Sequence, residues 1–193
     1  MRQLLEQVSF WSDQEVLRGV GNEMETIRLT IDGQAVEAAA DQTVLQAARA
    51  AGCGIPTLCY CPSLKPTGSC RVCLVEVQGM RSLATACTLP VSDGMTVFTN
   101  TPKVRQARRG VVELLLSDHP AECLTCSRSG SCELQSVAQN LGIRALPYGG
   151  SMGERSLDSS NPSILRDMRK CISCRRCVEV CSQVQGVSAL GAS

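Results

Sequence analysis

The chain has 193 residues, of which 19 are Lys or Arg and 18 are Asp or Glu, so its formal net charge is +1. This balance excludes the strong basic field of a typical nucleic-acid-binding protein and the acidic tail that recruits basic partners. Aromatic residues make up only 3% of the chain, which favours one or two small globular modules with modest cores.

Cysteine is the most informative residue of the composition. There are 13 cysteines, a density typical of disulfide-bonded or metal-binding proteins. The N-terminal residues lack the uninterrupted apolar stretch of a secretion signal, and no stretch approaches the roughly 20 apolar residues that span a bilayer. We therefore expect a cytoplasmic chain, without a membrane span, whose thiols stay reduced and bind metal.

Residues 1–23 form a weakly patterned extension ahead of the first regular elements. Their apolar side chains could form an amphipathic helix that docks on a partner. Alternatively, the segment is a flexible extension, or Met24 is the native start.

Residues 24–100 are predicted to form a compact α+β module. Apolar and polar residues alternate over 27–31, which predicts a strand with one buried face, and Asp32-Gly33 is a strong hairpin signal. Asp41 is a candidate cap for a helix that ends at Gly52. A cysteine-bearing loop over 54–71 follows. Further strands are predicted over 72–77, 83–87 and 95–98. This is the order of elements of a β-grasp domain.

Residues 101–146 are predicted to be helical. Thr101 is a candidate cap, Pro102 suits the first helical position, and a second helix ends at Gly142. Four basic residues on the first helix form either a solvated face or a docking site: Lys103, Arg105, Arg108 and Arg109. Residues 147–163 are polar and turn-forming, which predicts a linker, and a last small module covers 164–193.

Three groups of cysteines follow one another with different spacings. The first is Cys59-x10-Cys70-x2-Cys73-x13-Cys87, with three cysteines on one loop and the fourth on a neighbouring strand. One close pair with distant anchors suits a 2Fe–2S cluster, which needs four thiolates. Structural zinc is the alternative, although zinc sites more typically show two Cys-x2-Cys pairs.

The second group is His119-x3-Cys123-x2-Cys126-x5-Cys132. His119 is the only histidine in the chain, and it directly precedes three cysteines that lack a fourth ligand. A neutral imidazole in place of a thiolate removes one negative charge and generally raises a cluster's reduction potential. The alternatives are a zinc site of three Cys and one His, or a surface histidine.

The third group is Cys171-x2-Cys174-x2-Cys177-x3-Cys181. This is the bacterial ferredoxin spacing for a 4Fe–4S cluster, because two successive x2 gaps let one short loop reach three corners of a cube. The usual proline after the fourth cysteine is Ser182 here.

The fourth ligand of the last cluster is open. In two-cluster ferredoxins the fourth cysteine of such a run binds the other cluster, and a helix would carry Cys181 away from its own. We predict that Cys181 is nevertheless the ligand, through a local break in the helix after Cys177. Cys53, Cys61 and a neighbouring subunit are the other candidates; otherwise Cys53 and Cys61 are predicted to be structural.

Three segments of the chain carry a family resemblance. Ile-Pro-Thr-Leu-Cys at 55–59, Cys-Arg-Val-Cys-Leu-Val-Glu-Val at 70–77 and Ala-Cys-Thr at 86–88 resemble the 2Fe–2S module of the large iron–sulfur subunit of bacterial respiratory complex I and the N-terminal region of iron-only hydrogenases. Residues 117–126 and 130–135 are similar to the 4Fe–4S module that those families hold by one His and three Cys. Residues 169–178 with 184–187 resemble the first half of the ferredoxin-like module that follows, so the resemblance covers residues 24–190.

The resemblance implies one 2Fe–2S cluster and two 4Fe–4S clusters, on the ligand sets given above. It also implies an electron-transfer subunit, without catalytic residues of its own, of a soluble NAD(H)-linked oxidoreductase, foremost a hydrogenase, including the electron-bifurcating kind. The expected partners are a flavin- and NAD-binding subunit that carries FMN and NAD, a small thioredoxin-like 2Fe–2S subunit, a catalytic hydrogenase or dehydrogenase subunit, and ferredoxin. One alternative is the truncated N-terminal part of a larger iron-only hydrogenase or formate dehydrogenase; a remote one is a zinc-held interaction module.

Overall fold

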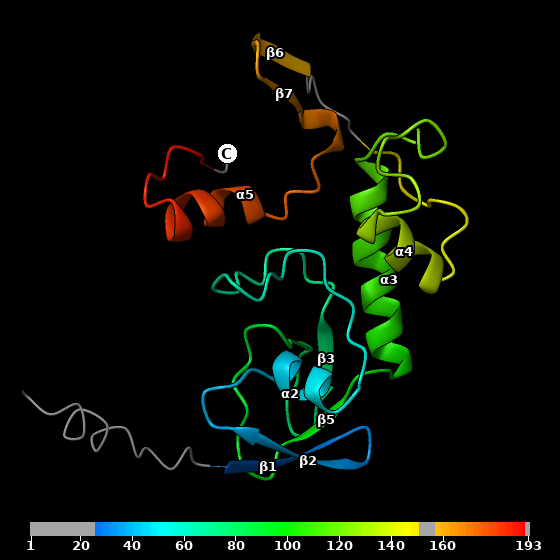
Figure 1. Ribbon diagram of the computed structural model, residues 1–193. Coiled ribbons are helices and arrows are strands. Elements are labelled where there is room, and N and C mark those ends of the chain that lie inside the picture. The colour runs from blue at the N-terminus through cyan, green and yellow to red at the C-terminus, as the bar shows by residue number, and fades with distance from the viewer. Residues whose placement is uncertain (1–25, 151–156, 192–193) are drawn as a thin grey trace, which may run out of the picture.

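The computed structural model describes residues 26–150 and 157–191 (Figure 1). The predicted extension over 1–23 and the candidate start Met24 lie outside the described residues.

A five-stranded mixed sheet forms the base of the first module. β1 (Thr26–Ile31) and β2 (Gln34–Ala39) form an antiparallel hairpin, and Asp32 and Gly33 both have positive φ, as the predicted two-residue turn requires. The remaining strands are β3 (Leu74–Val77), β4 (Ala84–Thr85) and β5 (Thr96–Phe98). The sheet order is β2-β1-β5-β3-β4, with β5 parallel to β1 and antiparallel to β3. The predicted α+β class is confirmed, and β4 is shorter than the strand predicted over 83–87.

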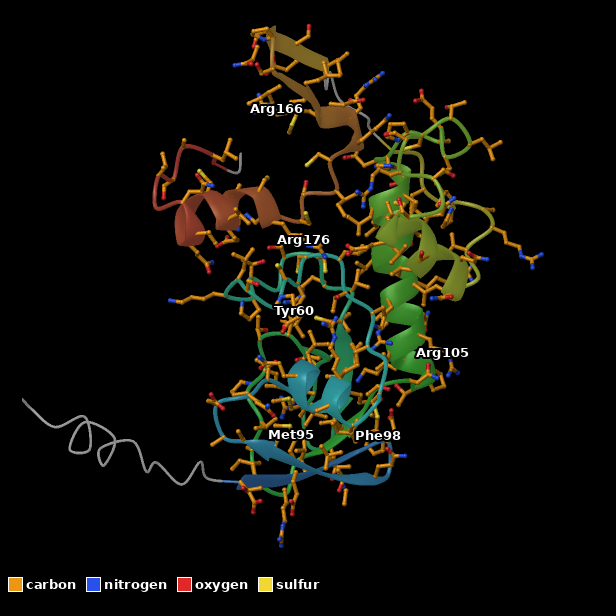
Figure 2. The ribbon with its side chains drawn as sticks, in the orientation of Figure 1. Tyr60, Met95, Phe98, Arg105, Arg166 and Arg176 are labelled. Carbon is orange, nitrogen blue, oxygen red and sulfur yellow. The ribbon has the colours of Figure 1, made fainter. Side chains whose placement is uncertain are left out.

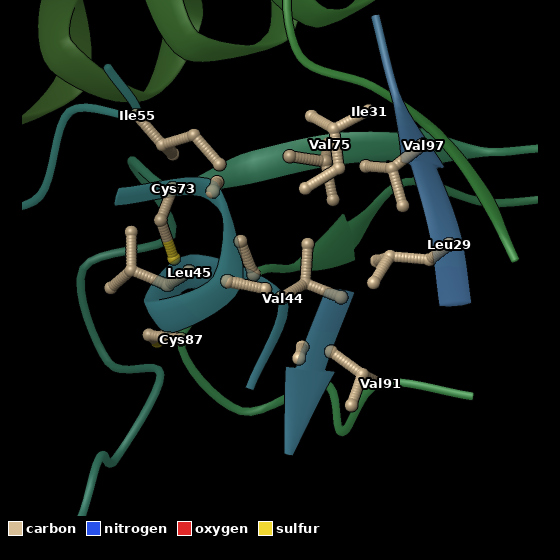
Figure 3. Close-up of a cluster of buried hydrophobic side chains, with 14 of the residues drawn as sticks. Leu29, Ile31, Val44, Leu45, Ile55, Cys73, Val75, Cys87, Val91 and Val97 are labelled. Carbon is tan, nitrogen blue, oxygen red and sulfur yellow. The ribbon is translucent and has the colours of Figure 1, made fainter. Parts of the chain in front are cut away.

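α2 (Val44–Ala50) packs on this sheet and closes the first core. Figure 3 shows Val44 and Leu45 of the helix among side chains of the strands, and both are fully buried. The prediction that Asp41 caps this helix is wrong. Thr43 is the cap: its hydroxyl accepts the amide of Gln46, whose side chain in turn accepts the amide of Thr43. This reciprocal capping box needs a residue three positions before Gln46, and Asp41 lies too early.

α3 (Pro102–Ser117) and α4 (Glu133–Asn140) form the helical region, and they lie beside the first module (Figure 1). The predicted cap is confirmed, because the Thr101 hydroxyl accepts the amide of Val104. The same hydroxyl donates to Glu76 of β3 at 2.8 Å, so the cap also fastens the helix to the sheet.

One basic residue of α3 departs from the predicted solvated face. Arg108 is only 5% exposed, and its Nε and Nη2 donate to the carbonyl oxygen of Leu74 at 3.1 and 2.7 Å. It faces β3 because it lies one helical turn after the buried Val104, on the face of α3 that packs against the sheet.

The C-terminal part begins with a hairpin of β6 (Leu157–Asn161) and β7 (Ile164–Asp167). β6 lies inside the predicted linker over 147–163, so regular structure starts earlier than Ile164. The turn-forming residues around Pro162 join the two strands. A 3-10 helix (Met168–Lys170), the single α-helical turn α5 (Arg176–Glu179) and a π-helical turn (Val180–Val184) follow.

Candidate metal centres

The structure brings the four cysteines of the first group together. Cys59 and Cys70 lie on the long loop, Cys73 precedes β3, and Cys87 follows β4; all four are buried. The thiol of Cys59 hydrogen-bonds with those of Cys70 and Cys87, and the thiol of Cys73 with that of Cys87. The long loop, the start of β3 and the segment after β4 therefore bring four sulfur atoms together at one buried site.

A glycine shapes the loop that carries this group. Gly68 has φ of +65°, a left-handed conformation that side chains rarely adopt. A Cβ built there would lie 3.3 Å from Cγ2 of Thr88, one residue after Cys87. The loop can therefore approach the segment around Cys87 closely only with glycine at this position.

The contacts among these thiols change their acidity. Hydrogen bonds from Cys70 and then Cys87 lower the pKa of Cys59 to about 2, and the hydrogen bond from Cys87 lowers the pKa of Cys73 to about 7. The same contacts raise the pKa values of Cys70 and Cys87, which keep their protons as donors. The thiolate charge of Cys59 and Cys73 is thus already stabilised by neighbouring thiols. Such a set of sulfur ligands fits a cationic iron centre, which would displace the protons of Cys70 and Cys87 on binding.

The second group surrounds one pocket. His119, Cys123, Cys126 and Cys132 all line it, and Lys170 reaches it from the C-terminal part. His119 comes just after α3, and Cys132 is the N-terminal cap residue of α4. The Cys126 sulfur accepts the amide of Arg128 at 3.5 Å. The predicted histidine and its three cysteines thus face a common space, with one sulfur at the positive end of a helix.

Cys171 and Cys174 of the third group lie on the segment that leads into α5, Cys177 lies in α5, and Cys181 lies in the π-helical turn that follows. The sulfur of Cys171 accepts the amide of Ser173 at 3.4 Å, and that of Cys181 accepts the amide of Ala189 at 3.2 Å. The predicted break takes a different form: helical structure continues past Cys177, but the α-helix ends at Glu179 and gives way to a π-helical turn from Val180, which contains Cys181. A π-turn changes the direction in which a side chain leaves the helix, and such turns are frequent at functional sites.

One apolar cluster contacts all three groups. Val112 of α3 and Leu134 of α4 are buried in it together with Cys59 and Cys70 of the first group. Cys132 of the second group and Cys174 of the third group pack against it. A groove beside this cluster is lined by both Cys70 and Cys171. The three groups are therefore neighbours around one core, although they are far apart in sequence.

The two remaining cysteines lie elsewhere. Cys53 packs against the core of the first module, and Cys61 is half-buried on the long loop. Among the described residues, no three His, Cys, Asp or Glu side chains are arranged to hold a single metal ion. An iron–sulfur cluster does not need such an arrangement, because inorganic sulfide supplies the rest of each iron's coordination.

One contact between distant residues beside the cysteine groups is not evident from the sequence. Arg176, Tyr60 and Glu133 meet although they come from three different segments: Arg176 Nη1 lies 2.9 Å from Glu133 Oε2, and its Nη2 donates to the Tyr60 carbonyl oxygen at 3.1 Å. The one available signal is that each residue directly adjoins a cysteine of a different group.

Two segments of the chain match iron–sulfur families. Residues 24–102 match the family model of a 2Fe-2S iron-sulfur cluster binding domain, and residues 108–146 match that of the NADH-ubiquinone oxidoreductase-G iron-sulfur binding region. These matches favour iron–sulfur clusters over the zinc alternatives.

Longer relatives share most of the chain. It is 49% identical over 173 residues to the NADP-reducing hydrogenase subunit HndD of Solidesulfovibrio fructosivorans, covering 86% of this chain and 29% of that relative. It is 41% identical over 169 residues to an NADH-quinone oxidoreductase subunit of Rhizobium meliloti, covering 86% of this chain and 20% of that relative. The chain therefore spans less than a third of the length of these curated relatives.

A solved structure shares the fold. A chain of the NAD+-reducing NiFe-hydrogenase in its H2-reduced state matches with a TM-score of 0.79 and 34% identity, covering 86% of this chain and 71% of that chain. In the described part of this chain, none of the helices is both long and apolar enough to cross a membrane.

Proposed function

This chain belongs to the family of iron–sulfur subunits shared by NAD(P)-linked hydrogenases and NADH-quinone oxidoreductases, and on that basis we propose that it relays electrons between a flavin- and NAD-binding partner and a catalytic subunit. The observation that carries the proposal is the apolar cluster contacted by cysteines of all three groups. Electron transfer slows steeply with distance, so centres grouped around one core suit a relay.

The proposed clusters follow the cysteine groups. The first group would hold a 2Fe–2S cluster, and the second and third groups would each hold a 4Fe–4S cluster, each able to take up and release an electron. The proposed ligands are Cys59, Cys70, Cys73 and Cys87 for the first; His119, Cys123, Cys126 and Cys132 for the second; and Cys171, Cys174, Cys177 and Cys181 for the third. The contacts among the first four thiols and the shared pocket of the second set support this assignment.

The chain's own residues set the surroundings of each site. The first group is buried, which excludes water and limits the exchange of ligands, whereas Cys123 and Cys177 are exposed. We therefore propose that partner subunits dock near the second and third groups. The first group would then pass electrons to other clusters of this chain without contacting a partner itself. His119 carries no negative charge when neutral, which favours a higher potential at the second site than four thiolates would give.

A soluble cytoplasmic hydrogenase is the assembly that we propose. The first relative and the solved structure are both hydrogenases by name, which favours hydrogen over formate as the substrate of the catalytic partner. FMN and NAD would sit on the flavin subunit, and a thioredoxin-like 2Fe–2S subunit and ferredoxin are the further proposed partners. In the first relative the matched region is part of a longer polypeptide, so a second proposal is that the catalytic site follows on the same chain.

The test is anaerobic purification of the native assembly. We expect a brown protein with about ten irons in this chain, from one 2Fe–2S and two 4Fe–4S clusters. Electron paramagnetic resonance of the reduced protein should show both cluster types. Mass spectrometry of the co-purifying subunits identifies the catalytic partner. A colourless chain filled with zinc would refute the relay.

A further inference from the structure

A single guanidinium group links the three cysteine groups. Arg176 lies between Cys174 and Cys177 in the third group, and Figure 2 shows it near the loop that carries Tyr60. One of its nitrogens donates to the carbonyl oxygen of Tyr60, the residue after Cys59, across 116 positions in sequence. The other pairs with Glu133, the residue after Cys132. Arg176 therefore contacts the immediate neighbour of a proposed ligand in each of the other two groups.

The ion pair with Glu133 is partly exposed, because the Glu133 side chain is 51% exposed, and the bond to the Tyr60 carbonyl is the part-buried half of the link. The Arg176 side chain is 33% exposed, and its Nε is buried without a hydrogen-bond acceptor among the residues that the structure describes. The guanidinium is planar, so its two terminal nitrogens hold Tyr60 and Glu133 in a fixed relation. A second link supports the same arrangement: the Lys65 amide donates to Gln183 Oε1 at 2.8 Å.

We propose that Arg176 is the positioning residue of the relay: it fixes the three cysteine groups relative to one another, and its positive charge favours the reduced clusters. This inference rests on the proposed function, because it assumes that clusters occupy the three groups. A shift of Tyr60 or Glu133 moves the adjoining ligand and so changes the distance that an electron must cross.

The charge acts together with the geometry. A cluster becomes more negative when it is reduced, so a cation held close by stabilises the reduced form and raises the potential. The neighbouring Arg175 carries the same charge, but its side chain is exposed and makes no hydrogen bond or ion pair within the described residues. Arg175 is therefore the matched control for a positive charge in the same motif that does not bridge.

The experiment compares three variants of the full chain in its assembly: Arg176→Gln, Arg176→Lys and Arg175→Gln. Three quantities are measured: iron per chain, the cluster potentials with their magnetic coupling by redox-controlled electron paramagnetic resonance, and hydrogen exchange of the peptides around Tyr60 and Glu133. Glutamine removes both charge and fork, whereas lysine keeps the charge and loses the planar fork. Comparing the two variants therefore separates the effect of the bridging geometry of Arg176 from the effect of its positive charge.

For Arg176→Gln we expect unchanged iron, weaker coupling between clusters and faster exchange at both contact peptides. Its oxidised-to-reduced ratio at a fixed potential should rise roughly threefold to tenfold, tenfold being about 59 mV for a one-electron couple. Arg176→Lys should show the faster exchange and weaker coupling with potentials near those of the wild type. Arg175→Gln should match the wild type in iron, exchange and coupling, and it should shift the potentials less than Arg176→Gln does, because the exposed charge of Arg175 is screened by solvent. If Arg176→Gln fails to accumulate, Arg176→Lys decides by the same exchange and coupling measurements.

Two results would overturn the inference. One is an Arg176→Gln chain that matches Arg175→Gln in exchange, coupling and potentials. The other is loss of iron from the third group alone with the other two sites unchanged, which would make Arg176 a local support of one cluster. A wild-type assembly without any cluster is a different failure, because it refutes the proposed function itself.

Discussion

Replacing Arg108 by methionine tests how the buried cation of α3 stabilises the first module. Methionine keeps much of the length of the side chain and removes the charge and both hydrogen bonds to the Leu74 carbonyl. Burial lowers the pKa of Arg108, because the protein interior disfavours the cation, while the nearby Cys73 favours it. The variant therefore loses two hydrogen bonds, and it also removes the free-energy cost of burying the charged guanidinium.

The balance between the lost hydrogen bonds and the relieved desolvation cost depends on whether the first cysteine group holds its proposed cluster. A buried carbonyl left without its donor costs about 1–3 kcal/mol, and a hydrogen bond to a charged group contributes about 1.5–3 kcal/mol. In the iron-loaded chain the negative cluster beside Cys73 offsets the desolvation of Arg108, so we expect Arg108→Met to lose about 2–4 kcal/mol of unfolding free energy. In the iron-free chain only Cys73 and Asp32 favour the cation, so the offset is smaller and we expect a loss below about 1 kcal/mol.

The assay is anaerobic urea unfolding, followed by visible absorbance for the loaded chain and by far-ultraviolet circular dichroism for both chains. At a slope of about 2 kcal/mol per molar urea, the loaded variant should unfold at about 1–2 M lower urea. Arg105→Met is the matched control, because exposed Arg105 donates to the Asn100 carbonyl at 2.8 Å from the same helix; it should change stability by less than about 0.5 kcal/mol. Equal midpoints for the two loaded variants, or equal losses with and without iron, would refute this reasoning.

Three further predictions concern the ligands. His119→Cys should retain the second cluster at a lower potential because a thiolate adds negative charge; an unchanged potential in a redox titration would contradict this. Cys181→Ser should remove about four of about ten irons, whereas an unchanged iron count would place the fourth ligand elsewhere. Cys87→Ala should abolish the 2Fe–2S signal while Cys53→Ala retains it, as judged by electron paramagnetic resonance; equal spectra would refute the assignment.

The regular elements that carry strong local signals could be predicted from the sequence. Asp32-Gly33 specifies the β1–β2 turn, and the Thr101-Pro102 pair specifies the start of α3, because each signal acts within a few residues. The spacing of His119 and its three cysteines likewise indicated a common site, and the structure arranges them around one pocket.

Other features depend on contacts between distant residues, which local patterns do not encode. β6 has the sequence Leu-Asp-Ser-Ser-Asn, which has little strand propensity; it forms a hairpin with β7, which Arg166 supports by pairing with Asp158. Arginine is a residue type usually found at the surface, but Arg108 is buried because it lies opposite Leu74 of β3 and donates to its carbonyl oxygen. The bridge made by Arg176 requires three segments to meet, so only the folded chain reveals it.

The central position of β5 has a consequence for synthesis on the ribosome. β5 is the last strand of the five-stranded sheet to be made, yet it joins β1 to β3. The β1–β2 hairpin and the β3–β4 pair therefore cannot form one sheet until residues 96–98 have left the exit tunnel, and such long-range pairing is slow. Until then the first cysteine group has no closed core around it. Iron that reached these thiols earlier would meet them without the enclosure that protects them, so we expect stable loading of this proposed site only after residues 96–98 have emerged from the tunnel.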